Sequence, residues 1–296
     1  RKTAETIKLV GMGGQFYRLR NLGLHVNLCC ASLYVYLHRK GKLEMVTKTE
    51  TAIKISALKK SEIKLILVGQ TPLYYNAMTT KVKQQLLAGG GKKTAAEKRE
   101  IKHDPENEFR ASVYTHDADE TLLCFPCGGI KKAMATAALH TDGIKATELR
   151  RLITVMGNNA SVWGKPLLKM DVVRSADINR TPDIRTRAYL EEWCAEVRIS
   201  FTTPYFSNRS IVSILANAGM IVGIGDFRQE KGAGNFGMFD VTSEGSKDLQ
   251  GYVAEIKKNN RQVQINALAN PDIPEGDTST FELLEFINEE RLRRAA

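Results

Sequence analysis

The chain lacks the features that mark disulfide-stabilised and membrane-spanning proteins. Its five cysteines are an odd number in 296 residues, so they give no disulfide framework and indicate a reducing compartment. The sequence has no run of about 18 consecutive apolar residues, and no membrane span is expected. These two absences predict a cytoplasmic protein without a membrane partner.

Two short motifs are each missing a part that their usual chemistry needs. Cys124-x-x-Cys127 is half of a zinc site, and His116 and His140 could add ligands, but a second tight pair is absent. The proline and glycine beside the cysteines predict instead that both are small buried residues at a strand-to-helix turn. Residues 89–94, Gly-Gly-Gly-Lys-Lys-Thr, lack the spacing of a phosphate-binding loop and predict a flexible basic loop. We therefore expect neither a metal nor a cofactor.

A recognisable catalytic arrangement is also missing. Three histidines could act as the general base of a metal-independent ribonuclease: His103, His116 and His140. None of them stands in a motif with Ser, Cys or Lys, and polar surface positions explain all three. Three aspartates lie among arginines and are expected to pair with them rather than bind a divalent ion: Asp171, Asp177 and Asp183. The sequence predicts no catalytic residue, although it leaves enzyme activity open.

Positive charge is what the chain has in excess, with a formal net charge of +10. Residues 1–44 hold eight basic and two acidic residues, whereas residues 240–296 hold seven basic and eleven acidic ones. The 28 basic and 20 acidic residues between these segments make residues 45–239 basic in their own right. This distribution favours binding to a polyanion.

The first 44 residues differ from the rest of the chain. They contain the adjacent Cys29 and Cys30 and show no sustained apolar period. Met45 opens a polar stretch, Val-Thr-Lys-Thr-Glu-Thr, of the kind that commonly begins a soluble protein. We expect translation to start naturally at Met45, which would make residues 1–44 a leader that is not natively present. A native peptide spanning 39–46 in mass spectrometry would exclude this expectation.

Residues 45–242 are expected to form an α+β body with a polar insertion at 88–108 and an Arg-rich insertion at 174–192. Residues 243–296 are expected to form an acidic appendage with a terminal helix. Apolar periodicity and turn residues predict strands at 63–68, 109–115, 121–125, 149–156, 167–173, 193–202 and 236–241. The same criteria predict helices at 77–87, 128–139, 207–219 and 281–294. This order predicts two ferredoxin-like units, with antiparallel sheets and helices packed on one face.

The segment at 219–239 carries six glycines interleaved with basic and aromatic residues. A dinucleotide fingerprint needs a strand before its glycines and a helix after them. Here the predicted helix comes first and the strand follows, so that class of site is excluded. The glycines exceed what one helix cap and one turn require, and they indicate a loop that another backbone or a ligand approaches closely.

The order and spacing of this loop resemble the signature of the repeat-associated mysterious protein (RAMP) superfamily, the RNA-binding subunits and processing nucleases of CRISPR systems. The resemblance rests on Gly223-Ile224-Gly225 and Gly232-Ala233-Gly234, with Arg228 and Lys231 between the pairs. It implies that the loop joins the last helix and last strand of a ferredoxin-like (RRM/RAMP-like) unit and contacts an RNA backbone. It also implies assembly along a strand, as a homo-oligomer or filament.

A second resemblance is to an uncharacterised family encoded by tailed phages. It rests on Val68-Gly-Gln-Thr-Pro-Leu, Phe109-Arg-Ala-Ser, Phe125-Pro and Gly223-Ile-Gly-Asp-Phe-Arg. These motifs span the body from Ile63 to Asp240, and they imply a phage or prophage origin and the cytoplasm of a bacterial host. They imply no activity.

The Arg-rich segment has two interpretations. It is either a solvated surface or an arm whose guanidinium groups bind phosphates and stack on bases. Tyr189 and Trp193 follow it and offer aromatic surface, although Trp193 fits equally well in the core. Together with the loop, the segment predicts nucleic-acid contacts at Gly223, Gly225, Phe227, Arg228, Lys231, Gly232, Gly234, Arg174, Arg180, Arg185 and Arg187.

These patterns favour a phage-encoded protein that binds single-stranded RNA or DNA through its backbone, without catalysis. A phage structural or assembly protein, whose glycine loop packs against a neighbouring subunit, is the alternative from another class. A metal-independent ribonuclease is a third possibility. Salt-dependent binding separates the first two, because phosphate contacts weaken steeply as salt rises.

Overall fold

The computed structural model describes residues 57–87, 103–117, 119–174, 181–231, 234–243 and 247–295, together with the backbone of four strands nearer the N-terminus. Two compact units contain them: an N-terminal unit, Arg1–Ala57, and a C-terminal unit, Leu58–Ala296. In the first unit, β1 (Ile7–Val10), β2 (Phe16–Arg18), β3 (Tyr34–Arg39) and β4 (Lys42–Val46) form an antiparallel sheet in the order β2-β1-β3-β4. Met45 lies within β4, opposite Tyr36 of β3.

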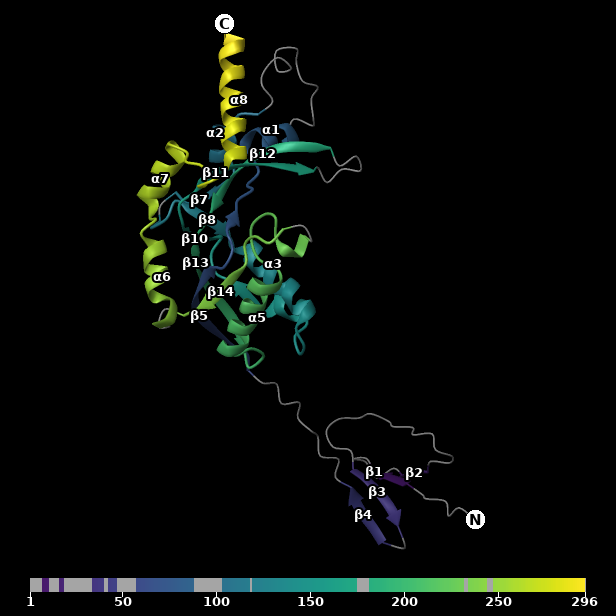
Figure 1. The fold of residues 1–296 in the computed structure, drawn as a ribbon. Coiled ribbons are helices and arrows are strands. Elements are labelled where there is room, and N and C mark those ends of the chain that lie inside the picture. The colour runs from purple at the N-terminus through teal and green to yellow at the C-terminus, as the bar shows by residue number, and fades with distance from the viewer. Residues whose placement is uncertain are drawn as a thin grey trace. The chain divides into compact units, whose positions relative to one another are not determined.

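A seven-stranded sheet forms the centre of the C-terminal unit (Figure 1). Its order is β14-β5-β13-β10-β8-β7, and β9 also pairs with β13. The strands are β5 (Lys59–Gly69), β7 (Tyr114–Thr115), β8 (Leu123–Pro126), β9 (Ile153–Val155), β10 (Asn159–Trp163), β13 (Cys194–Thr203) and β14 (Phe239–Thr242). All their pairings are antiparallel. The mixed α+β class and its antiparallel sheets are therefore as the sequence predicts.

Alternation along β5 and β13 gives this sheet two apolar faces. Leu65 and Val197 point into the main core, which α3 (Cys127–Ala137) and α5 (Asn208–Ile221) cover. Ile66 and its neighbours point to the other face, where they pack on α6 (Lys247–Lys257). The two body helices α3 and α5 thus lie on one face, and the second face is covered by α6 of the C-terminal segment, whose Val253 and Ile256 supply the apolar side chains.

A second, three-stranded sheet has the order β11-β12-β6. It contains β6 (Leu73–Tyr74), β11 (Leu167–Arg174) and β12 (Pro182–Leu190). Most of the described residues of the Arg-rich insertion predicted at 174–192 thus belong to strand β12. Sequence reasoning missed β12 because it counted the arginines as exposed, whereas the strand alternates polar residues with Ile184, Ala188 and Leu190.

Two predicted strands begin as helices instead. Residues 105–111 form α2 (Pro105–Ala111), because Pro105 occupies the first turn and Glu106 and Glu108 favour the positive end of the helix dipole. Residues 146–152 form α4 (Ala146–Leu152), which has two arginines in its last turn. The other predicted helices and strands of the body are present with shifted ends, including α1 (Thr80–Leu87).

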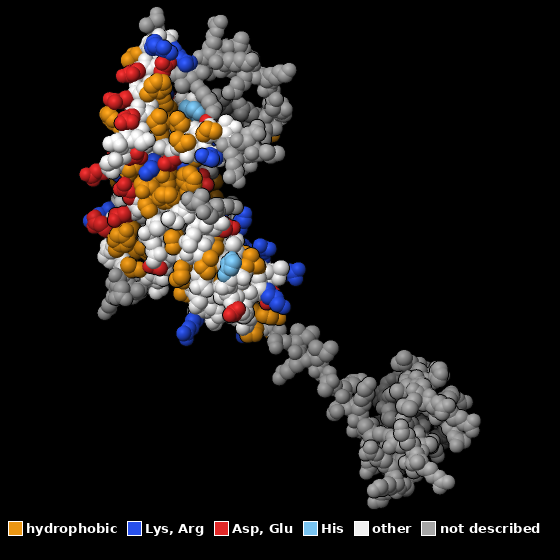
Figure 2. Space-filling model, turned by 45° about the vertical axis from the view of Figure 1, so that its right-hand side comes forward, with side chains coloured by type: hydrophobic (Ala, Val, Ile, Leu, Met, Phe, Trp, Pro, Cys, Tyr) orange, Lys and Arg blue, Asp and Glu red, His pale blue; other side chains and the backbone are white. Residues whose placement is uncertain are grey.

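The C-terminal segment packs on the rest of its unit. It forms α6, α7 (Arg261–Ala269) and α8 (Thr278–Ala295). The amide of Met170 on β11 donates to the Thr280 hydroxyl at 3.1 Å, which ties α8 to the second sheet. Acidic side chains gather along α8 (Figure 2). Among the helices that the structure describes, none combines the length and apolar character needed to cross a bilayer.

Candidate nucleic-acid interface

The glycine-rich loop, residues 222–238, folds back on itself between α5 and β14. The amide of Ile224 donates to the carbonyl of Gly237 at 2.9 Å, and the amide of Phe236 donates to the carbonyl of Phe227 at 3.3 Å. Gly237 has a φ of +72°, and a Cβ there would overlap the Ile224 carbonyl oxygen. Contact between the two arms of the loop therefore accounts for glycine at this position.

The same loop is hydrogen-bonded to β6 and to the segment that precedes it. The amide of Gly237 donates to the Pro72 carbonyl at 2.8 Å, and the amide of Asp226 donates to the Tyr74 carbonyl at 3.0 Å. Gly225, with a φ of +86°, also lies against the Tyr74 carbonyl, where a Cβ would not fit. The backbone of the loop is thus fixed against the second sheet.

Arg187 of β12 is the side chain that joins the loop to this sheet. Its guanidinium is 2% exposed and donates to Asp171 of β11 at 3.0 Å and to Asp226 of the loop at 2.9 Å. The guanidinium also stacks on the rings of Tyr74, at 4.7 Å, and Phe227, at 4.3 Å. Burial and the neighbouring Asp171 raise the pKa of Tyr74 well above its ordinary value. Arg187 thus holds β11, β12, β6 and the loop together.

Four aromatic rings surround this ion-pair cluster. The ring of Tyr74 lies 5.0 Å from Tyr189, 4.8 Å from Phe236 and 5.7 Å from Phe227, measured between centroids. Leu167 completes the apolar group. Aromatic pairs at these distances stabilise beyond their buried area, by about 0.5–1.5 kcal/mol each. The loop and the Arg-rich segment are separate in the sequence, but in the fold they form one surface. We call it the hairpin–loop surface.

The predicted contact residues occupy different places on this surface. Arg185 is exposed, and it lies on the face of β12 that carries Arg187, because it is opposite Asp171 in the register. Arg174 is exposed at the end of β11, opposite Pro182, and the two-residue period of the strand places it on the other face from Lys169 and Asp171. Arg228 is 17% exposed and pairs with Glu230 at 3.1 Å.

Three other predicted contact residues lie wholly or partly outside the described residues. The backbone of Lys231 ends the short 3₁₀ helix Gln229–Lys231, and its side chain lies outside the described residues. Arg180 and Gly232 also lie outside them. The sequence predicts a phosphate contact by Arg187, but both of its terminal nitrogens are engaged by carboxylates, so we assign it a positioning role.

Lys169 is a basic residue of this surface that the sequence reasoning missed. It lies directly opposite Arg187 in the β11–β12 register, and its ammonium stands 4.8 Å from the centre of the Tyr189 ring. The signal that could have found it is the two-residue period of the strand, which places Lys169 and Asp171 on one face. Asp171 pairs with an arginine as predicted. Asp183 accepts from His103, and Asp177 lies outside the described residues.

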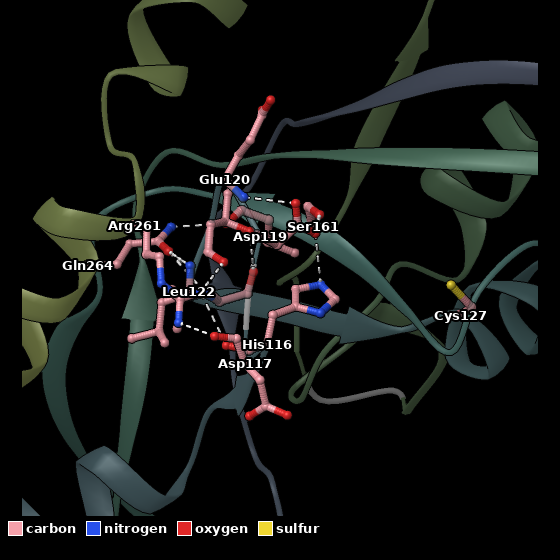
Figure 3. A network of polar contacts seen from close by, with 12 residues as sticks. His116, Asp117, Asp119, Glu120, Leu122, Cys127, Ser161, Arg261 and Gln264 are labelled. Atoms are coloured by element: carbon pink, nitrogen blue, oxygen red, sulfur yellow. Dashed lines mark hydrogen bonds and ion pairs between the residues drawn. The ribbon is translucent and has the colours of Figure 1, made fainter.

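The two cysteines of the incomplete zinc motif do not converge with the histidines. Cys124 lies in β8 and Cys127 begins α3, and both are buried, as predicted for a strand-to-helix turn. Burial raises the pKa of the Cys124 thiol to about 12. Figure 3 shows Cys127 lying apart from His116. Within the described ranges, no group of three or more His, Cys, Asp or Glu side chains is placed to hold a metal ion.

His116 belongs instead to a polar network that attaches α7 to the β7–β8 turn (Figure 3). Arg261 donates to the carbonyls of His116 at 3.2 Å, Asp117 at 2.8 Å and Thr121 at 3.1 Å. Gln264 is fully buried and accepts from the amides of residues 122 and 123. These bonds satisfy backbone groups of the turn, so the network has a structural role.

Asp119 gives this network a pH dependence. The hydroxyl of Ser161 donates to its carboxylate at 2.7 Å, and this bond, with the Glu120 amide and His116, holds its pKa below 3.8. A lowered pKa means that the stabilisation is present above the ordinary value and is lost as the pH falls through the lowered one. Because the side chain is 39% exposed, water screens it and the contribution is below about 1 kcal/mol.

We therefore expect Asp119→Asn to lower the free energy of unfolding at neutral pH, with the difference from wild type shrinking below about pH 4. Both tryptophans lie in the C-terminal unit, so their fluorescence during urea unfolding measures that unit. Glu120→Gln is the control, since no polar partner of its carboxylate is described. A constant difference between pH 7 and pH 3 would contradict the assignment.

The other two candidate histidines, His103 and His140, lie elsewhere in the C-terminal unit. His103 lies between Glu108, at 3.0 Å, and Asp183, at 3.2 Å, whereas His140 is exposed in the 3₁₀ turn Ala138–His140. Both histidines lie outside the polar network that Arg261 and His116 form.

No protein-family model matches the chain, and a search of curated proteins finds no match.

Proposed function

We propose that the protein binds single-stranded nucleic acid through the hairpin–loop surface. The observation that supports this proposal is the Arg187 cluster, which brings the glycine loop and the Arg-rich strand onto one surface. Arg185, Arg228 and Lys169 all lie on the strand face and loop that this cluster joins. Guanidinium and ammonium groups neutralise phosphates, and a fixed backbone orders them before the ligand arrives.

The proposal extends to the fold family. In sequence order, β5, α3, β9, β13, α5 and β14 follow the β-α-β-β-α-β pattern of a ferredoxin-like unit. Their sheet order, β14-β5-β13-β9, and the packing of α3 and α5 against one core support that assignment. The glycine loop then joins the second helix to the last strand, which is the position that the RAMP resemblance implies. A phage origin rests on the resemblance alone.

Contacts through phosphates rather than base edges are the chemistry that this surface favours. The tyrosine and phenylalanine rings of the loop cluster pack on one another and on Arg187, so they are already engaged and do not form an open stacking platform. Contacts by cations to the backbone give sequence-independent affinity. We propose RNA or DNA without sequence-specific readout as the ligand.

The direct test is binding of the full chain to labelled single-stranded RNA and DNA at about 50 mM salt. Binding that weakens steeply as salt rises supports the proposal, and a high ratio of absorbance at 260 to 280 nm after purification adds to it. Concentration-dependent assembly without nucleic-acid binding would favour a structural protein instead. RNA cleavage that one His→Ala substitution abolishes would favour the ribonuclease.

Replacing Arg228 and Lys231 together by alanine is expected to weaken this binding while the fold stays intact. Both residues belong to the loop, and each lost phosphate contact to a single-stranded nucleic acid should reduce the salt slope by about 0.7. Arg293→Ala/Arg294→Ala is the matched control, because it removes the same charge from the exposed last turn of α8. Equal affinities for the two double variants would place the contact elsewhere.

A further inference from the structure

A second basic surface lies at the end of the C-terminal unit where β5 begins. Five exposed cations come together there from three elements: Lys59 and Lys60 of β5, Arg150 and Arg151 of α4, and Arg209 of α5. We call this group the basic end. Figure 2 shows Lys and Arg side chains along this lower edge of the unit, opposite the acidic side chains of α8.

The strand register and one hydrogen bond bring these elements together. Lys59 and Lys60 pair with Thr203 and Thr202 at the end of β13. The hydroxyl of Thr202 donates to the carbonyl of Leu152 at 3.3 Å, which places the last turn of α4 beside the same strand end. Helix α5 begins at residue 208, shortly after β13 ends.

The cations of the basic end lack the carboxylate partners that most other basic side chains have in the described part of the chain. No ion pair or side-chain hydrogen bond holds any of the five there, whereas Lys165, Arg187, Arg228 and Lys257 are each paired with a carboxylate. Glu62, opposite Ser200 on the sheet, is the acid nearest in the register. Glu148 of α4 pairs with Lys145. The positive charge of this end is therefore largely uncompensated.

One further feature points to a phosphate-rich partner. Tyr205 is 64% exposed between β13 and α5, which adds an aromatic surface among the cations.

We infer that the basic end is a second contact for the phosphodiester backbone of single-stranded nucleic acid, and this inference rests on the proposed function for the identity of the ligand. Residues 59–69 of β5 span roughly 35 Å at about 3.3 Å per residue. The hairpin–loop surface lies at the other end of that strand, since Gln70 and Thr71 donate to Met238 (Figure 1). A single-stranded nucleic acid that contacts both surfaces must therefore run along the length of the C-terminal unit.

The test compares two oligothymidylates of about 5 and about 20 nucleotides, because only the longer one spans both ends at about 3.4 Å per stacked nucleotide. The full-length variant Lys59→Ala/Lys60→Ala/Arg150→Ala/Arg151→Ala should bind the longer strand at least about tenfold more weakly, with its salt slope reduced by about 2–3. Its affinity for the shorter strand should stay that of wild type. Arg293→Ala/Arg294→Ala is again the control, and circular dichroism shows whether each variant is folded.

Failure of this inference is distinct from failure of the proposed function. Wild-type affinity and salt slope in the folded basic-end variant, together with a loss in Arg228→Ala/Lys231→Ala, would overturn the second contact alone. A loss in the basic-end variant for both oligonucleotides, with none in the loop variant, would overturn the proposed hairpin–loop surface and keep the basic end. Binding of the chain to vesicles containing phosphatidylserine, but to neither oligonucleotide, would overturn both.

Discussion

Replacement of Arg187 by leucine should reduce the free energy of unfolding of the C-terminal unit by about 3–5 kcal/mol. The substitution leaves the carboxylates of Asp171 and Asp226 without the buried cation that pairs with both. It also removes the guanidinium between the rings of Tyr74 and Phe227. Urea unfolding followed by tryptophan fluorescence measures the loss, because both tryptophans lie in this unit.

The control for this experiment is Arg185→Leu, two residues before Arg187 on β12. Arg185 is exposed, and no carboxylate pairs with it in the described part of the chain, so Arg185→Leu should change stability by no more than about 0.5 kcal/mol. Adding Asp171→Asn and Asp226→Asn to Arg187→Leu should restore part of the loss, because the uncompensated charges disappear. Equal stability of the two leucine variants would show that the ion-pair cluster does not hold the loop.

Gly237→Ala is the second substitution with a large expected effect. A residue with a side chain at a φ of +72° costs about 1–2 kcal/mol in backbone conformation. The added Cβ also overlaps the Ile224 carbonyl oxygen, so the two arms of the loop must separate. Overpacking of this kind adds about 1–3 kcal/mol. We expect a total loss of about 2–5 kcal/mol, together with weaker nucleic-acid binding.

Gly143→Ala separates the two contributions. Gly143 has a similar φ of +82°, but a Cβ there meets no atom within 4 Å. Its substitution should cost only the conformational part, about 1–2 kcal/mol, and should leave binding unchanged. The same urea experiment measures both variants. A loss in Gly237→Ala no larger than in Gly143→Ala would mean that the loop accommodates the extra atom.

Local sequence patterns were sufficient for the elements with strong periodicity. Helix α5 has a serine N-cap whose side chain accepts from Ser210, and β13 alternates buried and polar residues, so both could be predicted. Strand β12 could not be predicted in this way, because its alternation is recognisable only when Arg187 is known to be buried against two carboxylates. One of those carboxylates, Asp226, is 39 residues away in the sequence.

The candidate site was predictable in its parts but not in its assembly. The glycine loop and the arginines were each visible, yet nothing local to either segment shows that they meet. The sequence left open whether another backbone or a ligand approaches the glycines, and the structure shows that it is the backbone. Gly223, Gly225, Gly234 and Gly237 all lie against backbone carbonyl groups of the protein. The argument for a ligand therefore depends on the basic side chains of the hairpin–loop surface, above all the exposed Arg185, rather than on the glycines.

The salt dependence of binding to a single-stranded oligonucleotide tests the central claim most directly. For the wild-type chain, the logarithm of the binding constant should fall linearly with the logarithm of the salt concentration. Replacing Arg185 and Arg228 together by alanine should reduce that slope by up to about 1.4, whereas Arg293→Ala/Arg294→Ala should not change it. No binding at about 50 mM salt, or an affinity that is indifferent to salt, would contradict the proposed function.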